Sequence, residues 1–254
     1  MSDQHRNVIL DQFTRQAVPF STAPGIKDEE ALRLVVEFSG TTAKDTVLDV
    51  ACGPGILTCA LARRAQHVTG LDLTPAMLDR ARALAAEKGL ANMTWRQGEA
   101  IPLPYPDAAF SMVVSRFAFH HFLDPRGALG EMRRVCAPGG RVVVVDSAPA
   151  PDKAEAFNRM ELYRDPSHVR AMPEGELRGL FRAVGLPEPR VSGYRLEGDL
   201  EGLLGRSFPN PGDDDKIRAL FRASLGDDAL GIGARRDGDV IRYGYPVAVL
   251  VADR

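Results

Sequence analysis

The loop at positions 49–55 combines the residue types that most clearly indicate chemistry. It reads Asp-Val-Ala-Cys-Gly-Pro-Gly from position 49 and follows a short apolar run. Glycines in such a loop let the backbone approach a ligand closely, and ligands of open α/β sheets bind beyond the carboxyl ends of the strands. The next apolar run ends at a second acid, Asp72, where a carboxylate typically bonds ribose hydroxyls. The pattern therefore predicts a cofactor that contains a nucleoside.

The charge of this loop distinguishes two kinds of cofactor. A dinucleotide places its pyrophosphate at a helix N-terminus and prefers the pattern G-x-G-x-x-G. Here Thr58 stands at the place of the third glycine, and Asp49 begins the loop. A carboxylate repels a pyrophosphate but suits a cationic ligand such as S-adenosylmethionine, which carries an ammonium and a sulfonium group. The sequence therefore favours S-adenosylmethionine over a nicotinamide dinucleotide.

Two adjacent histidines, His120 and His121, follow the predicted strand at 110–115 and fall near the expected point of group transfer. A neutral imidazole can accept a proton from a substrate hydroxyl or amine, so both are candidate catalytic residues. Adjacent residues on a loop or a helix start point apart, and on that ground at most one of them faces the site. A metal site needs more convergent ligands than these two, and we predict none.

A polar cluster in the second half of the chain is a further candidate site. It contains Arg164, Asp165, His168 and Arg170. One interpretation is substrate recognition, since arginine can bind a carboxylate or a planar polar group. The other is a structural network that orders a junction between helices. The sequence leaves both open, and Arg164, His168 and Arg170 are candidate substrate residues.

The elements that must position these residues alternate between strands and helices. Short apolar runs predict strands at 47–50, 67–72, 93–96, 110–115 and 141–146. Helical periodicity and capping residues predict helices at 28–38, 56–65, 74–88 and 126–136. This alternation is typical of βαβ units on a parallel sheet. The near-continuous valine runs predict strands that are covered on both faces.

The remaining segments are less regular. Residues 1–25 are polar with scattered aromatic side chains, and we expect 1–27 to form an N-terminal lid. Later patterns predict helices within 152–184 and 199–230, a strand at 191–196, a hairpin turn at Asp237-Gly238 and a final strand at 247–252. We interpret residues 1–254 as one α/β domain, with 28–150 as the cofactor-binding core and 151–254 as a helical cap and sheet completion.

The composition excludes several protein classes. The 254 residues carry a formal net charge of -2, with 44% hydrophobic and 26% charged residues, as in ordinary globular proteins. A protein that coats duplexes needs a basic face, so we expect no nucleic acid partner. The three cysteines form no CxxC pair, which disfavours a zinc cluster or a disulfide framework. The sequence shows no signal core and no run that would span a bilayer, so we expect a cytoplasmic protein without a membrane partner.

Together these stretches resemble class I S-adenosylmethionine-dependent methyltransferases of the ubiquinone and menaquinone biosynthesis type. The matching segments are VLDVACGPG, VTGLDLTPAMLDRAR, GEAIPLPYPDAAFSMVVSRFAFHHFLDP and EMRRVCAPGGRVVVVD, which cover about residues 45–146. The resemblance implies a Rossmann-like seven-stranded, mostly parallel sheet in the order 3-2-1-4-5-7-6, with strand 7 antiparallel and helices on both faces. The late hairpin signal and the final strand fit that arrangement.

The resemblance also implies which residues bind the cofactor. They are Asp49, Ala51, Gly53 and Gly55 for the methionine part, Asp72 for the ribose, Leu73, Gly98, Glu99 and Ala100 for the adenine, and Ser115 and Phe20 near the methyl group. Glu99 replaces the aspartate of the family, and Phe20 stands where many relatives have tyrosine. An aromatic ring there can contact a sulfonium by cation–π attraction. Arg116 is a further candidate catalytic residue and Phe117 a candidate substrate residue, because both follow the fourth strand, where the methionine end and the substrate meet.

The expected function is methyl transfer to a small aromatic or heterocyclic metabolite by in-line displacement, with S-adenosylhomocysteine as the second product. The protein mainly supplies proximity and alignment in such a reaction. A nucleotide-amine methyltransferase is disfavoured because SRFAFHH stands in place of an Asn/Asp-Pro-Pro-aromatic clamp. A regulator or cyclase that binds the cofactor without methylating is the alternative, and a nicotinamide oxidoreductase is less favoured. The chain is expected to be a monomer or a homodimer.

Overall fold

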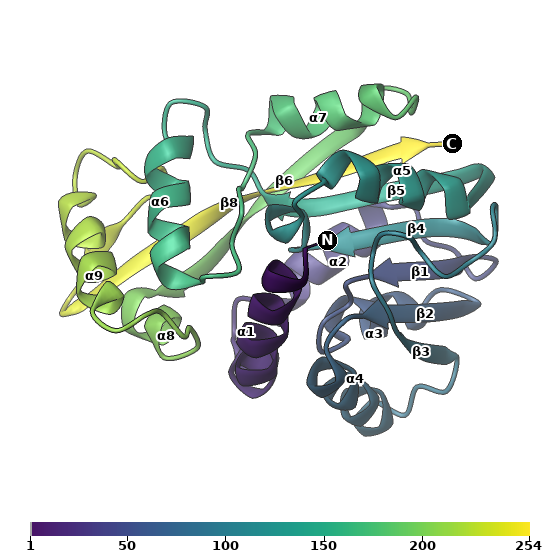
Figure 1. Ribbon diagram of the computed structural model, residues 1–254, viewed down its shortest axis with the longest axis horizontal. Coiled ribbons are helices and arrows are strands. Elements are labelled where there is room, and N and C mark those ends of the chain that lie inside the picture. Colours follow the sequence, from purple (N-terminus) through teal and green to yellow (C-terminus); the bar gives the residue numbers. More distant parts are fainter. Residues whose placement is uncertain (1) are drawn as a thin grey trace.

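The computed structural model describes residues 2–254 and is organised around one mixed β-sheet (Figure 1). The strands follow the order β3-β2-β1-β4-β5-β8-β6, and the short β7 pairs with β8 beside this path. Their bounds are β1 Thr46–Val50, β2 His67–Asp72, β3 Met93–Gln97, β4 Phe110–Arg116, β5 Cys136–Ser147, β6 Arg190–Asp199, β7 Arg235–Asp237 and β8 Val240–Asp253.

The direction of the strands changes at one edge of the sheet. Strands β1 to β5 pair in parallel, whereas β8 runs antiparallel between β5 and β6. The predicted order with an antiparallel seventh strand is therefore confirmed, because β8 occupies the place of that strand. The turn predicted at Asp237-Gly238 joins β7 to β8, and β7 adds one short strand that the sequence did not predict.

Helices cover both faces of the sheet and form a cap at one end (Figure 1). Their bounds are α1 Asp3–Thr22, α2 Glu29–Phe38, α3 Ile56–Ala62, α4 Pro75–Glu87, α5 Pro125–Val135, α6 Ala154–Arg164, α7 Glu174–Ala183, α8 Leu200–Leu204 and α9 Asp213–Ala223, with a 3-10 turn, η1, at Phe119–His121. Asp28 caps α2, as the sequence predicted, because its side chain accepts a hydrogen bond from the Ala31 N–H.

The two faces of the sheet carry separate apolar cores. Val142 and Val144 of β5 belong to the core on the side of α5 and α7. Val143 and Val145 belong to the core on the side of α2 and α3. All four side chains are fully buried, so the valine run is covered on both faces as predicted. This double cover fixes the strand ends at which the site is built.

A third apolar core lies beyond the end of β5, where β6 and β8 continue as a two-stranded ribbon. Helices α6, α8 and α9 pack there around Phe157, Phe221 and Tyr243 (Figure 1). Helix α7 comes from the same predicted cap segment but packs on the main sheet through Leu177 and Phe181. The cap therefore consists of α6, α8 and α9 with the extended ends of β6 and β8.

The N-terminal segment forms a long helix, α1, that the sequence did not predict. It lies against α4 (Figure 1). Its buried residues include Gln12, Gln16 and Ser21 as well as Ile9. A buried face that is partly polar gives little apolar periodicity, and this is why the pattern did not indicate a helix. Within residues 2–254 we find no helix with both the length and the apolar character needed to cross a membrane.

Candidate functional site

A cavity lies at the carboxyl ends of β1, β2 and β4, and residues of α1 form part of its wall. The predicted residues that line it are Phe20, Asp49, Ala51, Gly53, Asp72, Leu73, Gly98, Glu99, Ala100, Arg116, Phe117 and His121. Among residues 2–254, six other predicted residues do not line this cavity: Gly55, Ser115, His120, Arg164, His168 and Arg170. The cavity thus gathers most of the predicted cofactor positions and one of the two histidines.

The two glycines of the loop after β1 have different surroundings. Both have a positive φ, +54° at Gly53 and +76° at Gly55, which favours glycine. Within the described residues, a Cβ at Gly53 would meet nothing within 4 Å. A Cβ at Gly55 would lie 2.9 Å from both Ala81 Cβ and Trp95 Cη2. Gly53 therefore leaves room for a ligand, whereas Gly55 lets the loop pack against α4 and β3.

Asp72, at the end of β2, holds the glycine loop that follows β1. Its carboxylate accepts hydrogen bonds of 2.8 Å from the Gly53 N–H and of 2.8 Å from the Thr74 N–H. Burial raises the pKa of this carboxyl, while the two backbone donors oppose the shift. Each oxygen can accept a further hydrogen bond. The acid therefore both orders the glycine loop and can receive ribose hydroxyls.

Asp49 is almost completely buried at the end of β1, with 1% of its surface exposed. Its carboxylate accepts a 2.7 Å hydrogen bond from the Thr58 hydroxyl. Burial raises the pKa of Asp49 to about 7, although Thr58 and the positive charge of Arg116 favour the ionised form. A cationic ligand beside Asp49 would favour the ionised form further, so the position suits an ammonium group.

Arg116 joins the end of β4 to the segment that follows α1. Its Nη1 and Nη2 each donate to the Ile26 carbonyl oxygen at 3.3 Å, and its guanidinium stands 4.5 Å from the centroid of the Phe117 ring. Phe117 has a φ of +57°, uncommon for a bulky residue. Ser115 instead donates to the Val50 carbonyl oxygen at 2.9 Å. Ser115 thus ties β4 to β1, while Arg116 and Phe117 reach the cavity wall.

The segment after β3 brings Gly98, Glu99 and Ala100 to the cavity. The Glu99 carboxylate forms a 3.0 Å ion pair with Arg6 of α1. A Cβ at Gly98 would stand 2.9 Å from Leu71 Cδ1, so Gly98 lets this segment pack closely on the buried Leu71 side chain. Glutamate has a longer side chain than the aspartate of the family, and here it reaches Arg6 on the N-terminal helix.

His120 is held by an acid that the sequence analysis did not identify. Its Nδ1 lies 2.5 Å from Asp146 Oδ1, and the same carboxylate accepts from the Phe119 N–H at 2.8 Å. Burial lowers the pKa of His120, but Asp146 outweighs it and holds the pKa above its usual value. Asp146 ends the valine run of β5, and this strand-end position was the available signal. The acid fixes the turn η1.

His121 lines the cavity next to His120, with 4.3 Å between their ring centroids. Its Nδ1 lies 3.0 Å from the Ser167 carbonyl oxygen. A carbonyl can only accept, so Nδ1 carries the proton and Nε2 carries the free lone pair. Burial lowers the pKa of His121 to about 4. The imidazole is therefore neutral near pH 7, and its Nε2 can accept a hydrogen bond from a substrate.

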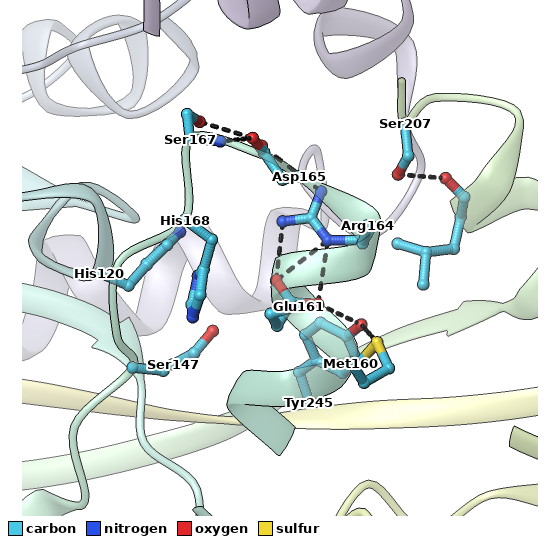
Figure 2. A network of polar contacts seen from close by, with 12 residues as sticks. His120, Ser147, Met160, Glu161, Arg164, Asp165, Ser167, His168, Ser207 and Tyr245 are labelled. Atoms are coloured by element: carbon cyan, nitrogen blue, oxygen red, sulfur yellow. Dashed lines mark hydrogen bonds and ion pairs between the residues drawn. The ribbon is translucent and has the colours of Figure 1, made fainter. Parts of the chain in front are cut away.

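The predicted substrate residues of the cap have protein partners, and Figure 2 shows those of Arg164. Arg164 donates to Glu161 from Nε and Nη2, with a shortest distance of 2.7 Å, and Tyr245 donates to Glu161 at 2.7 Å. His168 Nε2 lies 2.8 Å from Asn158 Oδ1. These contacts support the structural interpretation of the cluster.

Arg170 is far more exposed than Arg164. It pairs with Glu176 of α7 at 2.5 Å, and about half of each side chain is exposed. Within residues 2–254, the histidines, cysteines and acids form no cluster that could hold a metal ion. Substrate roles for Arg164, His168 and Arg170 stay predictions.

The chain is similar to known methyltransferases in sequence. Residues 48–144 match a family model described as a methyltransferase domain. The uncharacterized methyltransferase YcgJ of Bacillus subtilis is 32% identical over 206 residues, which are 80% of this chain and 81% of that protein. Demethylmenaquinone methyltransferase of Thermus thermophilus is 41% identical over 124 residues, which are 48% of this chain and 56% of that enzyme.

Solved structures share the fold. The crystal structure of YcgJ from Bacillus subtilis superposes with a TM-score of 0.78 at 26% identity and covers 89% of this chain and 98% of that one. The protein BH2331 of Bacillus halodurans gives a TM-score of 0.79 at 24% identity, with 88% and 98% covered. Sequence and fold thus agree with the chemistry of the cavity, and the chain belongs to the S-adenosylmethionine-dependent methyltransferases, with S-adenosylmethionine as its cofactor.

Proposed function

We propose that the chain transfers the methyl group of S-adenosylmethionine to a small aromatic or heterocyclic metabolite by in-line displacement. The observation that carries the proposal is the make-up of the cavity, which has acids at the strand ends and aromatic walls near His121. The wall residues are Phe13 and Phe20 of α1 and Phe117 and Phe122 after β4. Flat apolar walls suit a flat apolar acceptor, because they bury its rings and exclude water.

The strand-end residues fit the cofactor. The open space at Gly53 lets the methionine part approach the backbone. The buried carboxylate of Asp49 suits the ammonium group, and Asp72 has lone pairs for the ribose hydroxyls beyond its two backbone contacts. Leu73 and Ala100 supply apolar surface beside the place expected for adenine.

The chain's own residues align the acceptor and exclude water. When bound, S-adenosylmethionine supplies a methyl group on a sulfonium, and the electron pair of the broken carbon–sulfur bond stays on sulfur. Phe13 and Phe20 of α1 close the wall of the cavity, which keeps water from competing with the acceptor. The walls thereby hold the acceptor's lone pair in line with the bond to be broken.

His121 orients an acceptor that carries a hydroxyl. Its Nε2 lone pair accepts a hydrogen bond from the hydroxyl, and the hydroxyl proton is released to solvent once the oxygen–carbon bond has formed. With a pKa of about 4, His121 is a weak base at pH 7. Its contribution is therefore mainly alignment of the oxygen. His120, tied to Asp146, fixes the turn on which His121 stands.

The test is an incubation with methyl-labelled S-adenosylmethionine and a host extract separated by molecular size. Label in small, organic-extractable products is the expected outcome, and mass spectrometry then identifies the acceptor and the methylated atom. Label in RNA or protein would contradict the proposed acceptor class. Cofactor binding without transfer, even with an acceptor panel of phenols and heterocyclic amines, would favour a regulator or cyclase. Tight binding of NADH without S-adenosylmethionine binding would favour an oxidoreductase.

A further inference from the structure

Asp165 stands at the junction of three parts of the molecule. It follows the last residue of α6, and only 1% of its surface is exposed. Its Oδ2 accepts a 3.0 Å hydrogen bond from Gln16 Nε2 of α1. Its Oδ1 accepts a 2.9 Å hydrogen bond from the Ser167 N–H and one of 2.5 Å from the Ser167 hydroxyl (Figure 2). A buried carboxylate thus connects the N-terminal helix to the loop beside η1.

Ser167 passes this connection on to His121. Because the Ser167 hydroxyl donates its proton to Asp165, its oxygen faces His121 as an acceptor, 3.2 Å from Nδ1. The Ser167 carbonyl oxygen accepts from the same nitrogen at 3.0 Å. Both contacts require the proton on Nδ1. The carboxylate of Asp165 therefore sets the direction of the hydroxyl, and the hydroxyl helps to set the tautomer of His121.

Helix α1 touches His121 directly as well. His5 Nε2 lies 2.8 Å from the His121 carbonyl oxygen, and the Phe13 ring stands edge-on to the His121 ring at 5.0 Å between centroids. The same helix forms part of the cavity wall through Ile9, Phe13 and Phe20. The buried Gln16–Asp165 hydrogen bond forms only when α1 lies in this place.

The packing of α1 is suited to opening. Gln12, Gln16 and Ser21 lie on its buried face, where the Gln12 side chain donates to the Phe208 carbonyl oxygen at 3.4 Å and accepts from Gln16 Nε2 at 3.5 Å. A polar interface of this kind separates at a lower free-energy cost than an apolar core of equal area, because water replaces its hydrogen bonds. Since α1 supplies Ile9, Phe13 and Phe20 to the wall, displacement of this helix would open the cavity.

We propose that Asp165 is a positioning residue that couples the closing of α1 over the cavity to the alignment of His121. The inference rests on the proposed function for the role of His121 toward the acceptor. With α1 closed, Gln16, Asp165 and Ser167 form one hydrogen-bonded row that holds the His121 imidazole in a single tautomer and orientation. With α1 open, Asp165 loses the Gln16 donor, and His121 loses its contacts with His5 and Phe13. A site ready for transfer is then assembled only around an enclosed cofactor.

The decisive variant is Gln16→Glu in the full-length protein. It sets a second carboxyl group against Asp165 where the amide donor now stands at 3.0 Å. Because such a pair shares a proton near neutrality, the measurements are made at alkaline pH, where both carboxylates are ionised and their like charges push α1 outward. Hydrogen exchange of the α1 amides reports closure, and ¹⁵N NMR of the imidazoles reports the His121 tautomer, neither of which needs turnover. We expect exchange about tenfold faster in α1, together with loss of the single Nδ1–H signature of His121.

Matched variants separate coupling from a local defect. Asp11→Asn breaks an exposed ion pair with Arg15 on the same helix and should leave both signals as they are in the parent chain. The double variant Gln16→Glu with Asp165→Asn reverses donor and acceptor and should restore both signals. Gln16→Ala is the milder replacement if the glutamate variant does not fold, and it should move both signals in the same direction.

The coupling is overturned if α1 exchange quickens while the His121 signature stays unchanged, or if α1 exchange does not change in Gln16→Glu. It is also overturned if the double variant closes α1 but leaves His121 disordered, because His121 would then depend on Asp165 alone. These readouts are independent of the labelled-methyl assay. Intact coupling without methyl transfer would reject only the proposed function, and transfer with unlinked signals would reject only the coupling.

Discussion

At the scale of single residues, Asp72 offers the most direct test of the cofactor site. Replacing it with alanine removes a carboxylate that can receive ribose hydroxyls, and we expect S-adenosylmethionine affinity to fall by about 1–3 kcal/mol. Isothermal calorimetry measures this loss. Asp79→Asn is the matched control, because Asp79 is an exposed acid that pairs with Arg82 on α4. Unchanged affinity in Asp72→Ala would remove this acid from the cofactor site.

His121→Ala tests the alignment of the acceptor. The variant should retain cofactor binding, while turnover falls by about 10- to 100-fold because the neutral imidazole no longer orients the acceptor. Since the pKa of His121 is about 4, its absence should not change the pH dependence near neutrality. His67→Ala serves as control, because His67 contacts Thr94 at the far end of β2. Full activity in His121→Ala would exclude His121 from the mechanism.

The sequence indicated single residues where a strand end and a charge coincide. Asp49 and Asp72 were identified in this way, and both line the cavity. Asp146 occupies an equivalent place near the end of β5 but was not selected, because its partner His120 is distant from it in sequence. Ser167 could not be identified at all, since its importance comes from a hydrogen bond that only the folded chain brings about.

At the scale of elements, the loop between β1 and α3 allows a paired comparison. Gly55→Ala places a methyl group 2.9 Å from Ala81 Cβ and Trp95 Cη2, so we expect a stability loss of about 1–3 kcal/mol by urea unfolding. In Gly53→Ala the added methyl group meets no atom within 4 Å among the described residues, but it occupies space expected for the cofactor. The free energy of cofactor binding should therefore decrease more than the free energy of unfolding. A reversed pattern would mean that the roles of the two glycines are exchanged.

Elements were predictable where burial is apolar. The β5 run alternates between two apolar cores, and its composition alone indicated a strand covered on both faces. Helix α1 was not predictable in this way, because Gln12 and Gln16 occupy buried positions that a periodicity analysis counts as exposed. The strand order came from the resemblance to a family rather than from local pattern, since pairing across the sheet leaves no local signal.

At the scale of the whole molecule, the cap depends on a buried ion pair. Arg164→Ala would leave Glu161 buried without its main partner, although Tyr245 still donates to it, and we expect a stability loss of about 3–5 kcal/mol. Arg170→Ala, which breaks the exposed pair with Glu176, should cost only about 0–1 kcal/mol. Thermal unfolding compares the two. A stable Arg164→Ala protein with a raised acceptor KM would instead support substrate recognition.

The raised pKa of Asp49 couples binding of the cofactor to the release of a proton. Near pH 7 the free protein carries a proton on part of its Asp49 population, because burial raises the pKa to about 7. A bound cation lowers that pKa, so the proton is released on binding, and affinity should rise as pH increases through about 7 and level off above it. The released proton is taken up by the buffer. The apparent heat of binding should therefore differ between phosphate and Tris at equal affinity, whereas equal heats would show that Asp49 is already ionised in the free protein.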